Sequence, residues 1–193
     1  INGYLVGIVG QLTPRSQWKG QREFILSASE VCKQLDNVYF AIVGGDDSPI
    51  SDPHHGSYIR ELKKLAKDLG IEDHVIFTGY RKDIPDVMAS LDVLVSASYA
   101  EPFGRVIIEA MAAGKPVIGT NAGGAPEIIQ NGITGIIVPP KDYRSISEAL
   151  IYILQNEEKR KSMGEAGRKR VNEYFSLERN VEQIQNIYEN IIN

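Results

Sequence analysis

The chain has 193 residues, which is enough for one domain and marginal for two. Its composition is 42% hydrophobic and 24% charged, which excludes disordered and fibrous proteins. The formal net charge of −4 argues against a protein surface that binds nucleic acids or membranes in general, because these negatively charged partners attract basic proteins. A single cysteine, Cys32, excludes an internal disulfide framework, and its helical stripe with Ile25, Ala28 and Leu35 predicts a core thiol.

Short β-branched runs begin near the start of the chain and recur to about residue 140. The sequence starts at Ile1 rather than at a methionine and leads straight into the first run. We therefore expect that this start is an internal cut in a longer sequence. No apolar run approaches the roughly 20 residues of a membrane helix. Most of the runs are continuously apolar, as in a parallel sheet covered on both faces. The predicted strands are Tyr4–Gly10, Val38–Gly44, His74–Gly79, Asp92–Ala97, Pro116–Thr120 and Gly135–Val138.

Amphipathic stretches fill the gaps between these strands. Gly70, Gly114 and Gly132 stand where helices are expected to end. Strands alternating with helices predict right-handed crossovers and a doubly wound, six-stranded, Rossmann-like α/β fold. The predicted helices are Gly20–Leu35, Tyr58–Leu69, Ile84–Leu91, Gly104–Ala113 and Pro126–Gln130.

The last 50 residues are helical, with predicted helices at Ser145–Gln155, Glu157–Asn172 and Leu177–Ile192. The final helix carries one apolar face, here called the terminal stripe, made of Leu177, Val181, Ile184, Tyr188 and Ile191. Packing against its own domain is the more ordinary role for this stripe, and contact with a partner domain outside the chain is the alternative. We therefore divide the chain into a domain at 1–175 and a terminal helix at 176–193.

Ligands of open α/β sheets bind outside the carboxyl ends of the strands, so we expect ligand contacts in the segments that follow the strands. Residues 10–20, after the first strand, contain neither a G-x-G-x-x-G nor a Walker A pattern. They form an expected loop that brings Lys19 to a helix start, where anions are favoured. A solvated lysine is the alternative interpretation.

The segment after the fourth strand predicts a phosphate site. Pro102 and Gly104 favour a tight entry into a helix beginning near Phe103, and the first backbone N–H groups of such a helix lack internal partners. Glu109 lies five residues beyond Gly104, about 7.5 Å along the axis, where it can accept hydrogen bonds from a diol beside a bound phosphate. A surface ion pair between Arg105 and Glu109 is the alternative.

Two further loops have ambiguous patterns. Gly123 and Gly124, after the fifth strand, permit either a close backbone approach to a ligand or a plain turn. The loop after the second strand gathers acidic and histidine side chains at a spacing that fits no fixed set of metal ligands, and we expect a solvated loop and no metal site. These side chains are Asp46, Asp47, Asp52, His54 and His55.

Residues 101–120 contain Glu101-Pro-Phe-Gly and, after four residues, Glu109-Ala-Met-Ala-Ala-Gly-Lys-Pro-Val-Ile-Gly-Thr. This pattern, followed by Ala122-Gly123-Gly124, resembles the C-terminal domain of the retaining group 1 glycosyltransferases of GT-B fold. The likeness extends from Val6 to about Glu173 and includes the run Asn131–Val138. The resemblance implies transfer of a hexose-type unit from a nucleoside diphosphate sugar to a hydroxyl, without a metal or other cofactor.

The resemblance also implies roles for individual residues. Lys19 would contact the donor diphosphate, and Glu109 the ribose hydroxyls. Glu101 would face the transferred sugar as the catalytic glutamate. Backbone amides would hold the distal phosphate at Gly104, Arg105 and Val106, and the turn containing Tyr80 and Arg81 would line the nucleobase.

Two departures from the family pattern matter. Gln11 stands where family members carry an arginine, which removes one charge from the diphosphate site. The family's N-terminal domain, with its acceptor site, is outside this chain, so we expect the chain alone to be inactive. Its partners would be the donor, that domain and an acceptor such as a glycan, a lipid-linked sugar or a small molecule, with no nucleic acid. A cytoplasmic location is expected, with attachment of the full protein to the inner face of a membrane as a further option.

Three other functions remain open on these residues. A sugar-nucleotide epimerase or glycan phosphorylase would share the architecture, although no lysine context typical of pyridoxal phosphate is found. A non-catalytic nucleotide-binding module would explain the missing charge at Gln11. A plain interaction domain would leave the placement of Lys19, Glu101 and Glu109 at strand ends to chance.

Overall fold

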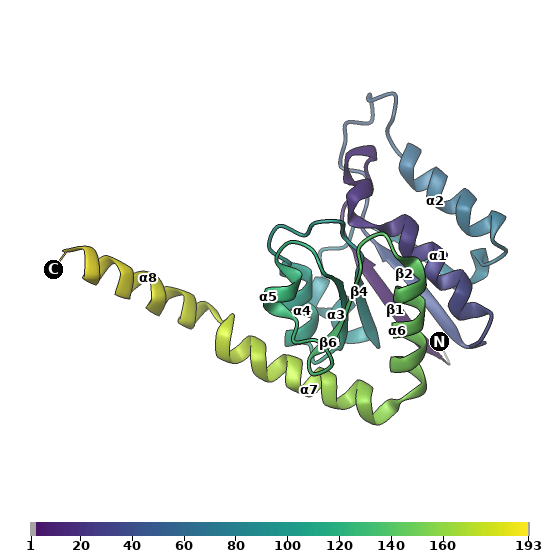
Figure 1. Cartoon of the computed structure of the whole chain (residues 1–193). Helices are drawn as coiled ribbons and strands as arrows, with labels where there is room; N and C mark the ends of the chain where they lie inside the picture. The colour runs from purple at the N-terminus through teal and green to yellow at the C-terminus, as the bar shows by residue number, and fades with distance from the viewer. Residues whose placement is uncertain (1–2, 193) are drawn as a thin grey trace.

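The computed structural model describes residues 3–192 and contains a six-stranded parallel sheet with helices on both faces (Figure 1). The strand order is β3-β2-β1-β4-β5-β6, which is the doubly wound arrangement expected from the sequence. Residues 1, 2 and 193, where the expected chain start and the last residue fall, lie outside the described range. The strands are β1 Tyr4–Val9, β2 Val38–Val43, β3 Val75–Gly79, β4 Val93–Ser96, β5 Val117–Thr120 and β6 Gly135–Val138.

Two layers of helices cover the sheet because side chains alternate along its strands. Val6 and Ile8 of β1 join the core beneath α1, α2 and α6, whereas Leu5 and Val9 face the layer that contains α3 and α4. The helices are α1 Gln21–Cys32, α2 Ser57–Asp68, α3 Ile84–Ser90, α4 Arg105–Ala112, α5 Ala125–Ile128, α6 Tyr143–Gln155, α7 Glu157–Tyr174 and α8 Leu177–Ile192. Cys32 is half-buried against the core beneath α1, α2 and α6, and burial raises the pKa of its thiol.

Local sequence sets several helix ends. The Asp142 side chain accepts hydrogen bonds from the backbone N–H groups of Arg144 and Ser145 and so caps α6. Asn156 caps α7 in the same way through Lys159. Gly70 and Gly114 follow α2 and α4 with positive φ angles of 69° and 72°, as expected of helix-terminating glycines.

Three local expectations differ from the structure. Gly132 does not end α5, because that helix stops at Ile128 and Gly132 lies in the turn that leads to β6. Residues 10–20 are not simply a loop: Pro14–Lys19 form the 3-10 helix η1, with the Ser16 hydroxyl donating to the Thr13 carbonyl at 2.8 Å. A second 3-10 turn, η2 at Glu72–His74, occupies the expected start of the third strand.

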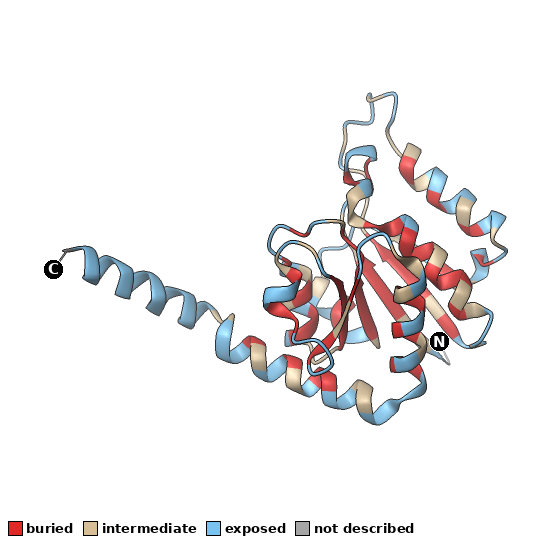
Figure 2. Cartoon of the chain, viewed as in Figure 1, coloured by how far each residue is buried: buried red, intermediate tan, exposed pale blue. Residues whose placement is uncertain are grey.

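Helix α8 extends away from the rest of the molecule beyond the end of α7 (Figures 1 and 2). The side chains of the terminal stripe are 45–75% exposed. The expectation that the stripe packs against its own domain is therefore wrong. Within the described residues, no helix is both long enough and apolar enough to cross a membrane.

Candidate functional site

Lys19 lies at the carboxyl edge of the sheet, fixed by the close packing of η1 on the neighbouring loop. Its side chain crosses over Gly10, where an added Cβ would come within 2.7 Å of the Lys19 Cδ atom. Gly20, with φ of 75°, packs so tightly that a Cβ there would lie 2.2 Å from the Ala97 carbonyl oxygen. The Lys19 ammonium sits 4.4 Å from the centroid of the Trp18 ring and is only partly exposed. This cation is therefore held at the edge rather than free in solvent.

Glu101 faces Lys19 across the ends of β1 and β4. Its Oε2 atom lies 3.7 Å from the Lys19 ammonium and accepts a hydrogen bond from the Ser98 hydroxyl at 2.9 Å. The Glu101 carbonyl accepts the Gly124 N–H at 2.7 Å. A Cβ on Gly123, whose φ is 63°, would lie 2.0 Å from that carbonyl oxygen, so this position requires glycine. The glycine pair thus holds the backbone of Glu101, a role that differs from both the ligand approach and the plain turn considered from the sequence.

Helix α4 begins beside this carboxylate. Gly104 is its N-cap with φ of 96°, and the helix starts at Arg105, one residue after the predicted start at Gly104. A Cβ on Gly104 would lie 3.7 Å from the Glu101 Cγ atom, which shows how close the helix start is to the glutamate. The N–H groups of Arg105 and Val106 have no partner within the helix, whereas Ile107 already donates to the Gly104 carbonyl at 2.9 Å. Lys19, Glu101 and the positive end of α4 therefore meet at one edge of the sheet.

Glu109 points from the same helix and is partly buried. Burial raises the pKa of its carboxyl group, and the charge of Arg105 lowers it by a smaller amount. No ion pair within 4.0 Å joins Arg105 to Glu109 in the part of the chain described, so that alternative is not realised. Glu109 is among the residues that line a hollow on each side of α4.

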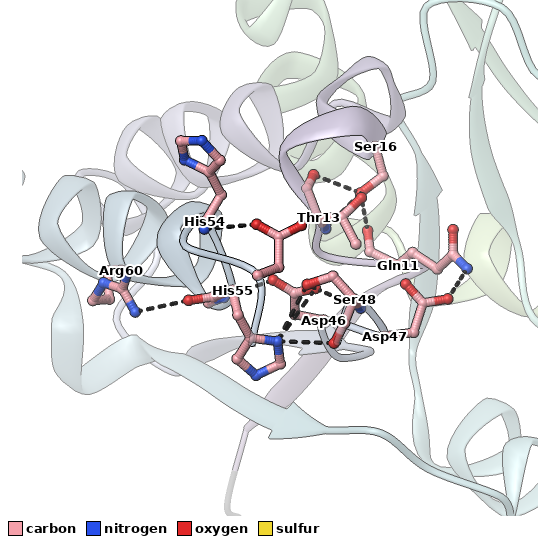
Figure 3. A network of polar contacts seen from close by, with 11 residues as sticks. Gln11, Thr13, Ser16, Asp46, Asp47, Ser48, His54, His55 and Arg60 are labelled. Carbon is pink, nitrogen blue, oxygen red and sulfur yellow. Dashed lines mark hydrogen bonds and ion pairs between the residues drawn. The ribbon is translucent and has the colours of Figure 1, made fainter. Parts of the chain in front are cut away.

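Gln11, Tyr80 and Arg81 line a cavity of about 360 Å³ at the ends of β1, β2 and β3. The Tyr80 side chain is 76% exposed. Arg81 pairs with Asp83 in the same turn. Gln11 donates a hydrogen bond to Asp47 at 2.6 Å, so its amide is directed toward an acid (Figure 3).

The acidic loop after β2 is organised around Asp46 (Figure 3). Its carboxylate accepts hydrogen bonds from Ser48 Oγ at 2.5 Å, Ser48 N at 2.9 Å and Gly56 N at 2.6 Å. Burial raises the Asp46 pKa, but the hydrogen bonds and nearby His55 outweigh it, and the net pKa is lowered. Across residues 3–192, no three His, Cys, Asp or Glu side chains are placed to hold a metal ion.

Sequence reasoning missed two polar residues of this region. Ser98 holds the Glu101 carboxylate, and only its spacing three residues before Glu101 could have suggested this. Tyr99 donates to Glu23 of α1 at 2.9 Å, and burial together with that carboxylate raises the Tyr99 pKa to about 12. This pair ties the loop of Glu101 to the helix that follows Lys19.

Comparisons with known proteins identify the family and the fold of this chain. The family model described as glycosyl transferases group 1 matches residues 2–170. The N-acetyl-alpha-D-glucosaminyl L-malate synthase of Bacillus anthracis is 40% identical over 131 residues, which are 68% of this chain and 34% of that protein. The crystal structure of Anabaena Alr3699/HepE in complex with UDP-glucose has a TM-score of 0.86 at 30% identity, covering 98% of this chain and 49% of that one.

One solved structure has nearly the same extent as this chain. It is the C-terminal domain of LpcC, a glycosyl transferase group 1 family protein from Francisella tularensis, with a TM-score of 0.81 and 30% identity. The match covers 92% of this chain and 89% of that domain. The chain thus spans half or less of the two longer proteins and most of an isolated C-terminal domain.

Proposed function

This chain belongs to the group 1 glycosyl transferase family, and we propose that it is the half of such an enzyme that binds a nucleoside diphosphate sugar. The resemblance carried by Glu101, Gly104 and Glu109 is thereby confirmed at the level of the family. The observation that supports the proposal most is the meeting of Lys19, Glu101 and the start of α4 at one sheet edge. HepE, which shares this fold, has been solved with UDP-glucose bound.

The proposed chemistry follows from where charge develops. When the sugar leaves the donor, negative charge grows on the diphosphate, and a cation together with a helix N-terminus stabilises it. Lys19 and the first N–H groups of α4 supply these two elements without a metal. Glu101 then faces the sugar, where its carboxylate orients hydroxyls and stabilises positive charge at the ring. We assign it no nucleophilic role.

The activity of the whole protein requires a second half. The chain spans 34% of the L-malate synthase and 49% of HepE, and its terminal stripe is exposed. We propose that the N-terminal half of the protein contacts this stripe and supplies the acceptor site. The acceptor, the hexose-type sugar and the cytoplasmic location remain predictions from the family.

A thermal-shift panel of UDP, GDP, ADP and their sugars tests the donor proposal. A ligand present at 100 times its Kd stabilises a protein by about 2.7 kcal/mol, so one nucleotide class is expected to raise the melting temperature clearly. Adenosine, uridine and guanosine serve as controls without phosphate. A chain that no nucleoside diphosphate or its sugar stabilises at millimolar concentration is not a donor-binding domain.

A non-catalytic nucleotide-binding module is the second candidate, favoured by the pairing of Gln11 with Asp47 in place of a cation. Such a module binds nucleotides but gains nothing from the sugar. The panel distinguishes the two, since a donor site prefers UDP-glucose over UDP, or GDP-mannose over GDP.

A further inference from the structure

Ser98 lies beneath the Glu101 carboxylate and is 3% exposed. Its hydroxyl donates to Glu101 Oε2 at 2.9 Å, and its carbonyl accepts the Thr120 hydroxyl at 2.5 Å. The next residue, Tyr99, donates its N–H to the Trp18 carbonyl at 2.7 Å. Ser98 is therefore fixed on one side by β5 and on the other by the helix that carries Lys19.

The two oxygens of the Glu101 carboxylate have different surroundings. Oε2 receives the Ser98 hydroxyl and lies 3.7 Å from the Lys19 ammonium. Oε1 has no hydrogen-bond partner among residues 3–192. Within that range, the only side-chain polar atom that is both fully buried and without a partner is Glu23 Oε2, so Glu101 Oε1 is not fully buried. Oε1 is therefore reachable from solvent, and it is the oxygen free to accept a hydrogen bond from a ligand.

We propose that Ser98 is a positioning residue that fixes the rotation of the Glu101 carboxylate and so directs Oε1 at the sugar of the donor. A carboxylate at the end of a flexible side chain has to be held within a narrow angle before it contributes to recognition. Ser98 supplies that constraint through a hydrogen bond of 2.9 Å from a buried hydroxyl. The inference rests on the proposed donor site and adds a residue that its motif does not contain.

The test measures what the sugar adds to binding. Titration calorimetry gives the Kd of UDP and of UDP-glucose, or of GDP and GDP-mannose, for the 193-residue chain. Ser98→Ala is expected to leave the Kd of the diphosphate within about twofold and to lower the preference for the sugar nucleotide about five- to tenfold. This is less than the loss of a whole charge-assisted hydrogen bond, because the Glu101 carboxylate remains and only its orientation is lost. Glu101→Ala is expected to abolish that preference.

The double variant Ser98→Ala with Glu101→Ala completes a double-mutant cycle for these two residues. If Ser98 acts through Glu101, the second substitution changes nothing further, because no carboxylate remains to be directed. Ser98→Cys keeps the size of the side chain with a weaker donor, and it replaces Ser98→Ala if that variant does not fold.

Different failures have different meanings. Equal weakening of UDP and UDP-glucose by Ser98→Ala assigns Ser98 a purely structural role and overturns the inference. A sugar preference that survives Ser98→Ala, or a parent chain without any preference, also overturns it while leaving diphosphate binding intact. A parent chain that binds no nucleoside diphosphate overturns the proposed function itself.

Discussion

Lys19 is held beside a carboxylate, and this position determines what its removal should do. Lys19→Ala is expected to weaken binding of the preferred nucleoside diphosphate by about 1.5–3 kcal/mol, the contribution of a hydrogen bond to a charged group. The bare nucleoside has no phosphate for Lys19 to contact, so its affinity should be the same for parent and variant. Calorimetric titration of both ligands checks the difference, and equal diphosphate affinity in parent and variant would place the phosphates elsewhere.

A matched substitution at Gln11 tests the missing charge. Gln11→Arg should leave diphosphate binding equal or tighter, by about 1 kcal/mol, as for a partly exposed ion pair. Asp47 complicates this gain because it already accepts the Gln11 amide at 2.6 Å and would attract the new arginine. The double variant Gln11→Arg with Asp47→Asn removes this competition and should bind more tightly than Gln11→Arg alone.

Glu109 is predicted to contact the ribose. Glu109→Ala should cost about 1.5–3 kcal/mol of nucleotide affinity through lost charge-assisted hydrogen bonds. The 2′-deoxy nucleotide should bind the parent more weakly than the ribonucleotide, while the variant should barely distinguish them. If the losses from the substitution and from the missing hydroxyl simply add, the Glu109 carboxylate does not touch the ribose.

At the scale of elements, the loop between β2 and α2 depends on one carboxylate. The Asp46 pKa is lowered from its ordinary 3.8, so the unfolded chain binds more protons in the window below that value. The stabilisation by Asp46 is therefore complete above about pH 4 and is lost as the pH falls through the folded pKa. Asp46→Asn should lower the free energy of unfolding by about 1–3 kcal/mol at pH 7, because hydrogen bonds to a charge are lost.

Denaturant unfolding from pH 7 down to pH 3 measures this loss. The difference between parent and Asp46→Asn should shrink below about pH 4, where the parent also loses the charge. Asp47→Asn, a change at the exposed neighbouring acid, is the control and should cost little at any pH. A constant difference across the range would show that the Asp46 charge does not hold the loop.

The sequence predicted elements well where local pattern determines them. The six strands were expected within one or two residues, because continuous apolar runs such as Val38–Val43 have few alternatives in a buried parallel sheet. Gly132 was misread because a glycine can serve a turn as well as a helix end. Helix η1 was missed because its six residues are rich in polar side chains and carry no clear period. Its position also involves contacts distant in sequence, such as the hydrogen bond from the Tyr99 N–H to the Trp18 carbonyl.

The candidate site likewise has a part that the sequence predicted and a part that it could not predict. Motif spacing predicted the shared location of Lys19, Glu101 and the start of α4 at the sheet edge. It could not predict the Ser98 contact or the pairing of Gln11 with Asp47, since these depend on rotamers and on loops 36 residues apart. Whether these side chains contact a donor stays a prediction.

At the scale of the whole molecule, α8 contributes little to the fold described here. Removing residues 177–193 deletes an exposed helix, so the free energy of unfolding of the remaining domain should change by no more than about 0.5 kcal/mol. Nucleotide affinity should also persist. Substituting Leu177, Ile184 and Ile191 by serine within the full chain is the matched control for the loss of the stripe alone. A large fall in melting temperature after truncation would mean that α8 packs on its own domain in solution.

The last prediction concerns transfer. The proposed donor contacts all lie within these 193 residues, whereas no separate acceptor site is evident within residues 3–192. Aligning the acceptor oxygen and excluding water by closure of two domains can contribute about 7–11 kcal/mol to lowering a barrier. The isolated chain should therefore bind its nucleotide, hydrolyse the donor slowly or not at all, and transfer sugar to no acceptor.

Addition of the N-terminal half, fused or in trans, should restore turnover measured as release of nucleoside diphosphate with acceptor present. Restoration should fail with the truncated chain and with the serine variant of the terminal stripe, although both keep their nucleotide affinity. That pattern would separate docking of the two halves from donor binding. Robust transfer by the isolated 193 residues would contradict the two-domain assignment, because an acceptor site would then have to exist within this fold.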